Sequence, residues 1–238
     1  MSFELNILGS GAALPTSKRQ ATSQYINCNE RHILIDCAEG TQQQLRKYGL
    51  KLQKIQYILI SHLHGDHFFG LPGLLSTMHL LGRNKKLQIF GPLGLEPLMR
   101  AMLAAGGHPL QFDITFHSLD PGAKQLIFED RLIEIYAFAL KHRIPTIGYR
   151  IDEKPKLLNL DKAAISAAGL TIEDLPKLKS GISIERNDIS TIIKITPCPL
   201  SLYIAMLFVP IPNRAPSIWK PYKTLTYCIT RLRLQICT

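Results

Sequence analysis

The stretch YILISHLHGDHFFGLPG, residues 57–73, places three histidines and one aspartate within six positions, directly after an apolar run. The run YILIS is short and continuously apolar, which is typical of a strand covered on both faces. The polar cluster begins where that strand ends, and α/β folds bind ligands at the carboxyl ends of their strands. The stretch therefore predicts a buried strand and a ligand site at its end, with the candidate ligands His62, His64, Asp66 and His67.

These side chains are the types that bind a divalent metal ion. Neutral imidazoles and a carboxylate suit zinc, which takes nitrogen and oxygen ligands at about 2.0–2.2 Å. A turn through Gly65, which tolerates left-handed backbone angles, would fold all four side chains inward. Four ligands so close in sequence suit two adjacent ions, and paired ions about 3.5–4 Å apart stabilise both the attacking and the leaving oxygen in phosphoester cleavage. The other interpretation is a histidine-rich surface loop, but the six-residue pattern is far more specific than a lone HxH pair.

The segments on either side of this stretch alternate between strand and helix patterns up to about residue 150. Strands are indicated by β-branched and alternating apolar residues, and helices by a glycine stop or a proline in the first turn. This order predicts sheets covered by helices, a layered α/β domain. Strands are expected at 4–9, 31–37, 55–61, 87–92, 125–130, 131–140 and 146–152, and helices at 40–49, 70–83 and 94–107.

The composition is that of a globular chain with a real core. The 238 residues are 46% hydrophobic and 19% charged, which is ordinary for folded domains. No signal peptide is recognisable and no uninterrupted run of about 18 apolar residues occurs, so we expect no membrane span. The five cysteines lack paired spacing, which favours free thiols in a reducing cytoplasm. The formal charge of +10 favours a polyanionic partner.

The character of the chain changes twice after residue 151. Residues 152–187 are rich in lysine, proline and short helical pieces, and we interpret them as an inserted arm; a surface helix with its loops is the alternative. Residues 189–238 contain no Asp, Glu or Gly, although such a stretch usually holds roughly nine or ten of them. Helix stops, tight turns and charge balance all depend on these residues. We therefore divide the chain into 1–151, the arm 152–187 and an atypical tail 188–238.

The sequence resembles the ribonuclease Z family, the transfer-RNA 3′-processing endonucleases of the metallo-β-lactamase superfamily. The resemblance is carried by SHLHGDHFFGLPGLL (61–75) and covers residues 3 to about 187. Four further segments agree with that family in the right order, namely LGSGAALPTSKRQATSQYI (8–26), ILIDCAEGTQQQLRK (33–47), HLLGRNKKLQIFGPLGL (79–95) and LKHRIPTIGYRI (140–151).

The resemblance implies a metallo-β-lactamase αββα sandwich with two zinc ions at one edge, here incomplete at the C-terminus. It implies an endoribonuclease that removes the 3′ trailer from precursor tRNA and leaves a 3′-hydroxyl on the tRNA. It also implies a protruding arm that grips the tRNA, which residues 152–187 match in position, and a homodimer in the cytoplasm.

The resemblance also implies roles for individual residues. His62, His64 and His142 would hold one zinc ion, and Asp66 and His67 would hold the other. Asp66 would also accept a proton in the reaction. In addition to these residues, Asp36 would support the ligand loop from behind. The remaining histidines have no motif around them and are expected to be structural or solvated: His32, His79, His108 and His117.

The tail departs from the family pattern. The family needs an Asp in a Cys-Ser-Asp-Thr-like stretch that bridges both ions, a His-Glu-Ala-Thr-like loop and a further His, whereas Asp188 is the last acid here and His142 the last histidine. Codons built from the third base of one residue and the first two of the next allow MLFVPIP (206–212) to read Ala-Ile-Cys-Ser-Asp-Thr. In the same shifted frame, KTLTYCITRLRLQI (223–236) can read Asp-Val-Asp-Leu-Leu-Tyr-His-Glu-Ala-Thr-Phe-Ala-Asp. We therefore hypothesise a frameshift between roughly Ser183 and Thr196; a divergent C-terminal domain is the alternative.

Three functions follow as hypotheses. The first is the zinc-dependent endoribonuclease, impaired in this chain because two expected ligands are missing. The second is a related metallo-hydrolase of a small phosphodiester or ester, and the third is an inactive tRNA-binding remnant. We expect about one zinc ion or less per chain, weak cleavage, and poor packing after about residue 188.

Overall fold

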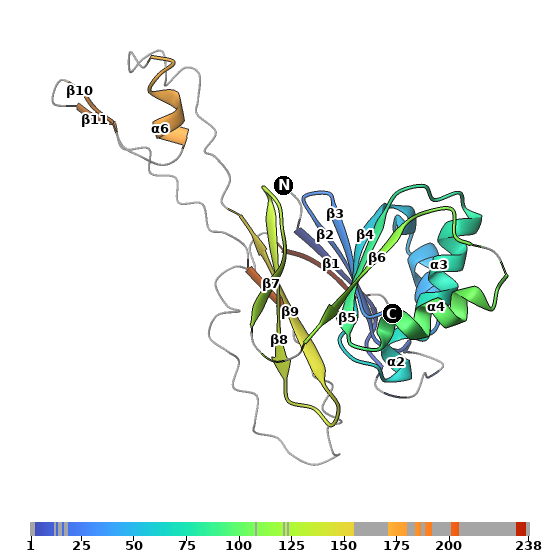
Figure 1. Ribbon diagram of the computed structural model, residues 1–238. Coiled ribbons are helices and arrows are strands. Elements are labelled where there is room, and N and C mark those ends of the chain that lie inside the picture. The colour runs from blue at the N-terminus through green and yellow to red at the C-terminus, as the bar shows by residue number, and fades with distance from the viewer. Residues whose placement is uncertain are drawn as a thin grey trace.

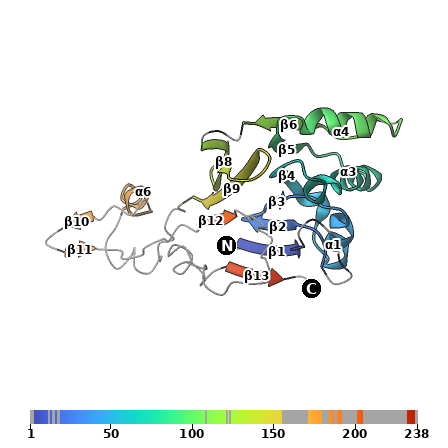
Figure 2. The same cartoon turned by 90° about the horizontal axis from the view of Figure 1, so that it is seen from below.

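The computed structural model describes residues 3–11, 13, 16, 19–107, 109–120, 122, 124–154 and 171–179, and the backbone of 184–186, 189–191, 201–204 and 232–236. Two β-sheets pack face to face, and helices cover the outer face of the larger sheet (Figures 1 and 2). The larger sheet has the strand order β13-β1-β2-β3-β4-β5-β6, and the smaller has the order β12-β9-β8-β7. The expected sandwich is confirmed for these layers; among the described residues no helix covers the outer face of the smaller sheet.

The larger sheet contains β1 (Phe3–Gly9), β2 (Ser23–Cys28), β3 (Arg31–Ile35), β4 (Ile55–Leu59), β5 (Leu87–Pro92), β6 (Ile114–Leu119) and β13 (Leu232–Ile236). The smaller sheet contains β7 (Gln125–Glu129), β8 (Ile133–Leu140), β9 (Thr146–Glu153) and β12 (Ser201–Ile204). The helices are α1 (Thr41–Lys47), α2 (Gly65–Phe68), α3 (Leu71–Leu80), α4 (Leu95–Ala104) and α6 (Leu175–Lys179), with a short 3-10 helix at Leu52–Lys54. A separate hairpin joins β10 (Ile184–Arg186) to β11 (Ile189–Thr191).

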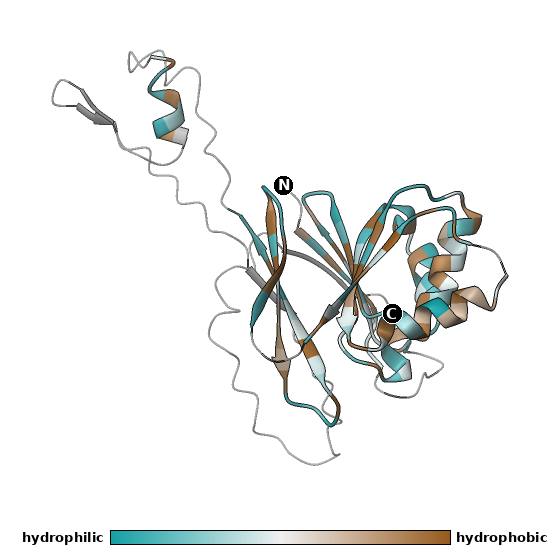
Figure 3. Cartoon of the chain, viewed as in Figure 1, coloured by the Kyte–Doolittle hydropathy of each residue, from teal (hydrophilic) through white to brown (hydrophobic). Residues whose placement is uncertain are grey.

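The inner strand β4 and the residue after it are apolar from Tyr57 onward, whereas Gln56 near the start of the strand is exposed. Tyr57 and Leu59 belong to the core between the two sheets. Ile58 and Ile60 belong to the second core, between the larger sheet and its helices. Because successive side chains of a strand point to opposite faces, a strand covered on both sides must be apolar at every position. Figure 3 shows the hydrophobic residues along the strands of both sheets and on the covering helices.

The topology brings the ends of several strands to one edge. β3, β4, β5 and β6 run parallel to one another, so their carboxyl ends lie along the same edge of the larger sheet. The segment that follows β4 is the polar cluster of the sequence. The smaller sheet reaches the same place, because the Ile147 amide of β9 donates a hydrogen bond of 2.9 Å to the Ser61 carbonyl.

The structure corrects several expected boundaries. Strands β2 and β6 were not predicted, and the strand expected at 31–37 ends at Ile35. It ends there because Asp36 adopts a left-handed backbone conformation, with φ of 53°, which breaks the extended geometry. The helix expected at 70–83 ends at Leu80. The other expected strands and helices are present within a few residues.

The arm and the tail are only partly described. Strand β9 continues to Glu153, which includes the first two residues of the expected arm. Helix α6 and the β10–β11 hairpin project away from the two sheets in Figure 1, while β12 pairs with β9 and β13 pairs with β1. The rest of the arm, and the poor packing expected after residue 188, lie outside the described residues. Over the part that is described, no helix has the length and apolar character needed to cross a membrane.

Candidate metal centre

The site begins at the end of β4, where the chain turns sharply. His62 follows the strand and is buried, with 5% of its surface exposed. His64 is the N-terminal cap of α2, a single helical turn that begins at Gly65 and contains Asp66 and His67. The strand, the turn and the short helix together place all four polar side chains of the motif at one edge of the sandwich.

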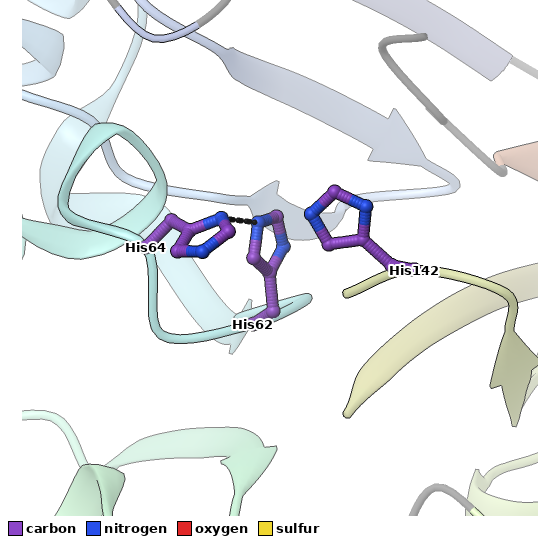
Figure 4. A group of neighbouring side chains, drawn as sticks. All are labelled: His62, His64 and His142. Atoms are coloured by element: carbon purple, nitrogen blue, oxygen red, sulfur yellow. Dashed lines mark hydrogen bonds between the residues drawn. The ribbon is translucent and has the colours of Figure 1, made fainter. Parts of the chain in front are cut away.

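A third histidine approaches His62 and His64 from the side of the smaller sheet. His142 lies in the turn between β8 and β9, and Figure 4 shows its ring facing His62 and His64. The candidate ligand atoms of these three residues all lie within 4.8 Å of one another. His62 Nε2 and His64 Nδ1 are 3.0 Å apart, and the ring centroid of His142 is 5.0 Å from that of His62 and 5.3 Å from that of His64. Two segments about 80 residues apart in sequence therefore form one three-nitrogen group.

The environment keeps His62 neutral. Burial, reinforced by the neighbouring imidazoles of His67, His64 and His142, lowers the pKa of His62 to about 3. A neutral imidazole is the form that binds a metal ion, because the ring nitrogen must offer its lone pair. The residues of the group thus fit a divalent ion by their chemistry as well as by their spacing.

Asp66 and His67 form a second pair beside the three histidines. The Asp66 Oδ2 atom lies 3.6 Å from His67 Nε2, and the ring of His67 is 3.8 Å from that of His62, centroid to centroid. Two ligands of one tetrahedral zinc ion lie about 3.3–3.6 Å apart if the bonds are about 2.0–2.2 Å long. Asp66 Oδ2 also accepts a hydrogen bond of 2.9 Å from the Ala13 amide. The pair has the spacing of two ligands to one ion.

Asp36 supports the ligand loop from beneath. Its carboxylate is buried and accepts hydrogen bonds from the Ser61 amide at 2.8 Å and the Ser61 hydroxyl at 3.0 Å. It also lies 2.7 Å from His67 Nδ1, which fixes the proton on Nδ1 and leaves Nε2 free to act as a ligand. Asp36 also has the left-handed backbone conformation described above. Such a strained backbone persists only where its surroundings hold it in place.

Two residues that the sequence analysis did not single out belong to this network. The Ser61 hydroxyl lies 3.0 Å from His62 Nδ1 and 3.2 Å from His67 Nδ1, so it joins both imidazole rings to Asp36. Its position inside the SHLHGDH motif was the only signal for it. Ala13 contacts Asp66 through its backbone amide, which no side-chain pattern can indicate.

The other histidines that the structure describes lie outside this group. His32 is buried, its Nδ1 atom lies 2.6 Å from the Tyr25 hydroxyl, and burial lowers its pKa. The ring of His117 stacks on Phe90 with a centroid separation of 4.3 Å. His79 accepts a hydrogen bond from the Gln111 amide. These contacts agree with the structural roles expected for them, whereas His108 lies outside the described residues.

Comparison with known proteins finds relatives that match most of the chain in sequence. Residues 3–149 match the family model described as Anti-Pycsar protein Apyc1. The chain is 42% identical over 179 residues to ribonuclease Z of Parabacteroides distasonis, which spans 75% of this chain and 59% of that protein. It is 38% identical over 180 residues to ribonuclease Z of Porphyromonas gingivalis, over 76% of this chain and 59% of that protein. The chain therefore spans less than two thirds of the length of these relatives.

A solved structure is similar to this chain in fold as well as in sequence. The crystal structure of human tRNase Z, short form, is similar with a TM-score of 0.59 and 34% sequence identity. The similarity covers 68% of this chain and 73% of the human chain. The layers seen here are accordingly those of the metallo-β-lactamase fold, with the three-histidine group at the edge of the sandwich.

Proposed function

The chain belongs to the metallo-β-lactamase-fold family represented by the Anti-Pycsar protein Apyc1 model and by the ribonuclease Z relatives, and from this premise we propose that it is a zinc-dependent endoribonuclease of the ribonuclease Z type. Its substrate would be precursor tRNA, cleaved so that the 3′ trailer leaves and the tRNA keeps a 3′-hydroxyl. The observation that carries the proposal is the convergence of His62, His64 and His142 on one point.

The described residues would hold metal in two groups. His62, His64 and His142 would bind the first zinc ion, and Asp66 and His67 would contribute to the second. When bound, such ions supply Lewis-acid stabilisation of the charge that develops on the phosphate oxygens during hydrolysis. Zinc is proposed because imidazole nitrogen and carboxylate oxygen at tetrahedral spacing are its usual ligands.

The protein's own groups would prepare the site for this chemistry. Burial holds His62 neutral, so no proton has to leave it before it binds a metal. Asp36 orients the imidazole of His67 through the 2.7 Å contact at Nδ1. We assign the role of proton acceptor to Asp66, whose Oδ2 atom lies 2.9 Å from the Ala13 amide and 3.6 Å from His67 Nε2. A base at hydrogen-bonding distance from the reacting water is the requirement for this role.

We propose that this chain is impaired, because its tail is read in a shifted frame. The shifted-frame reading of residues 206–212 contains the carboxylate that would bridge both ions, whereas in the sequence as given Asp188 is the last acid and His142 the last histidine. The first ion would keep three nitrogen ligands, but the second would keep only two protein ligands. Two protein ligands seldom retain zinc against water and chelators. About one zinc ion or less per chain, and weak cleavage, follow from this ligand set.

The proposed substrate and assembly rest on other features. Residues 152–187 would form the arm that binds tRNA phosphates, and the projection of α6 and the β10–β11 hairpin supports that role. We propose a homodimer, supported by apolar side chains that α3 and α4 expose, among them Leu80 at 81% and Met102 at 46%. A cytoplasmic location is proposed because neither Cys28 nor Cys37 forms a disulfide bond, as is usual in a reducing compartment.

The experiment that tests the proposal compares two chains on one substrate. A 5′-labelled precursor tRNA with a 3′ trailer is incubated with zinc and either the present chain or a version whose reading frame is restored after Ser183. We expect strong cleavage at the 3′ end by the restored chain, weak cleavage by the present one, and none by the restored chain carrying His142→Ala. Hydrolysis of bis(p-nitrophenyl) phosphate without precursor-tRNA cleavage by the restored chain would favour the small-phosphodiester hydrolase instead. Tight binding without cleavage by either chain would favour the inactive remnant.

A further inference from the structure

One aromatic ring beside the candidate metal centre is exposed to solvent. Phe69 follows α2 directly, and 59% of its surface is exposed. Its neighbour Phe68 is buried in the core between the larger sheet and the helices, and the two ring centroids are 4.9 Å apart. Phe68 therefore anchors the turn in the core, whereas Phe69 lies on the surface next to the ligand loop.

The ring of Phe69 packs on the backbone of the ligand loop. A β-carbon at Gly65, which lies between the ligands His64 and Asp66, would sit 2.2 Å from Cε2 of this ring. The Phe69 ring can therefore lie this close to the backbone only because residue 65 is glycine and has no side chain. One side of the ring thus rests on the loop that carries the candidate ligands, and the exposed remainder is available to another molecule.

The backbone beneath the ring is held in place by the loop after β3. The Cys37 amide donates to the His67 carbonyl at 2.7 Å, and the Gly70 amide donates to the Cys37 carbonyl at 2.9 Å. A β-carbon at Gly70 would lie 1.9 Å from the Ala38 carbonyl oxygen, so these segments touch along their backbones. Because the turn is fixed on both sides of Phe69, a molecule that stacks on the ring loses little free energy in ordering it.

We propose that Phe69 is a stacking platform for an unpaired nucleobase of the RNA substrate, next to the phosphate that enters the metal centre. The inference rests on the proposed endoribonuclease function and adds a substrate contact to it. Stacking on an aromatic face suits any base, because every base has a π-face. The platform would therefore fix the position of the strand without selecting its sequence.

The test is a binding experiment on the full chain, which needs no cleavage. Fluorescence anisotropy measures the affinity for precursor tRNA and for versions in which each nucleotide beside the cleavage site is abasic in turn. Base stacking is worth about 1–3 kcal/mol, so Phe69→Leu should weaken binding of the intact RNA by about 5- to 150-fold. Phe69→Tyr should bind nearly as well as the unaltered chain. Leu126→Ala, a change at an exposed apolar side chain on β7 in the smaller sheet, should leave the affinity unchanged.

The abasic RNAs separate stacking from other effects. At one flanking position, removal of the base should weaken binding to the unaltered chain, and Phe69→Leu should then add almost no further loss. An equal loss on intact and abasic RNA at every position would overturn the inference, as would a loss of self-association with no change in RNA affinity. If the unaltered chain binds no precursor tRNA, the proposed function fails together with this inference. If it binds and Phe69→Leu has no effect, this inference alone fails.

Discussion

Removal of His142 gives a quantitative prediction for the metal centre. The side chain contributes one of three imidazoles whose nitrogen atoms lie within 4.8 Å of one another. A structural zinc site with four ligands is worth about 10–16 kcal/mol, or about 2.5–4 kcal/mol per ligand. His142→Ala should therefore weaken zinc binding by about 50- to 1000-fold, since each 1.4 kcal/mol is about tenfold.

The measurement is a competition titration of the metal-free chain against a chromophoric zinc chelator at neutral pH. His142 lies in an exposed turn between β8 and β9, so we expect the free energy of unfolding of the metal-free chain to change little. His79→Asn is the matched control, because it also removes an imidazole but keeps an acceptor for the Gln111 amide. A zinc affinity for His142→Ala within about threefold of that of the unaltered chain, less than 0.7 kcal/mol, would refute the assignment.

Three further perturbations test the site and its supports. Asp36→Asn keeps a residue type that tolerates the left-handed backbone but removes the charge behind the His67 imidazole. In the version with its frame restored after Ser183, the affinity for the second zinc ion should therefore fall about 10- to 100-fold in the same titration. The pKa of His62 is about 3 in the folded chain and about 6.5 when unfolded, so the unfolded state binds more protons between these values. The free energy of unfolding of the metal-free chain should therefore fall from pH 6.5 toward pH 3, by up to about 4 kcal/mol from this group, and denaturant titrations should show a smaller fall for His62→Gln. Gly70→Ala should lower stability and zinc affinity together, because its β-carbon would lie 1.9 Å from the Ala38 carbonyl oxygen; Gly73→Ala, with its nearest neighbour at 3.5 Å, should cost nothing in the same unfolding measurement.

The sequence predicted those parts of the fold that depend on a strong periodic signal. The apolar run before Ser61 predicted β4 because both faces of that strand are covered. The strand β6 was not predicted, since ITFHSL (114–119) mixes polar and apolar residues and lies at the edge of the larger sheet in the described pairings, where burial is partial. Because β6 is only partly buried, its side chains need not be apolar at every position, so its sequence has no clear strand pattern.

The candidate site could likewise be predicted from the sequence only in part. His62, His64, Asp66 and His67 stand in one motif, so their proximity could be predicted from sequence spacing. His142 could be placed only through the family resemblance, because a turn in the other sheet carries it to the group. The Ala13 amide and the left-handed Asp36 are backbone features, and tertiary packing decides them without a trace in the pattern of side chains.

The most direct test of the account is the metal content of the purified chain. Zinc per chain is measured by elemental mass spectrometry after dialysis against a weak chelator, for the present sequence and for the version with its frame restored after Ser183. The account predicts about one zinc ion or less for the present chain and two for the restored one, because the restored frame supplies the bridging carboxylate that would hold the second ion. Two tightly held ions in the present chain would contradict it.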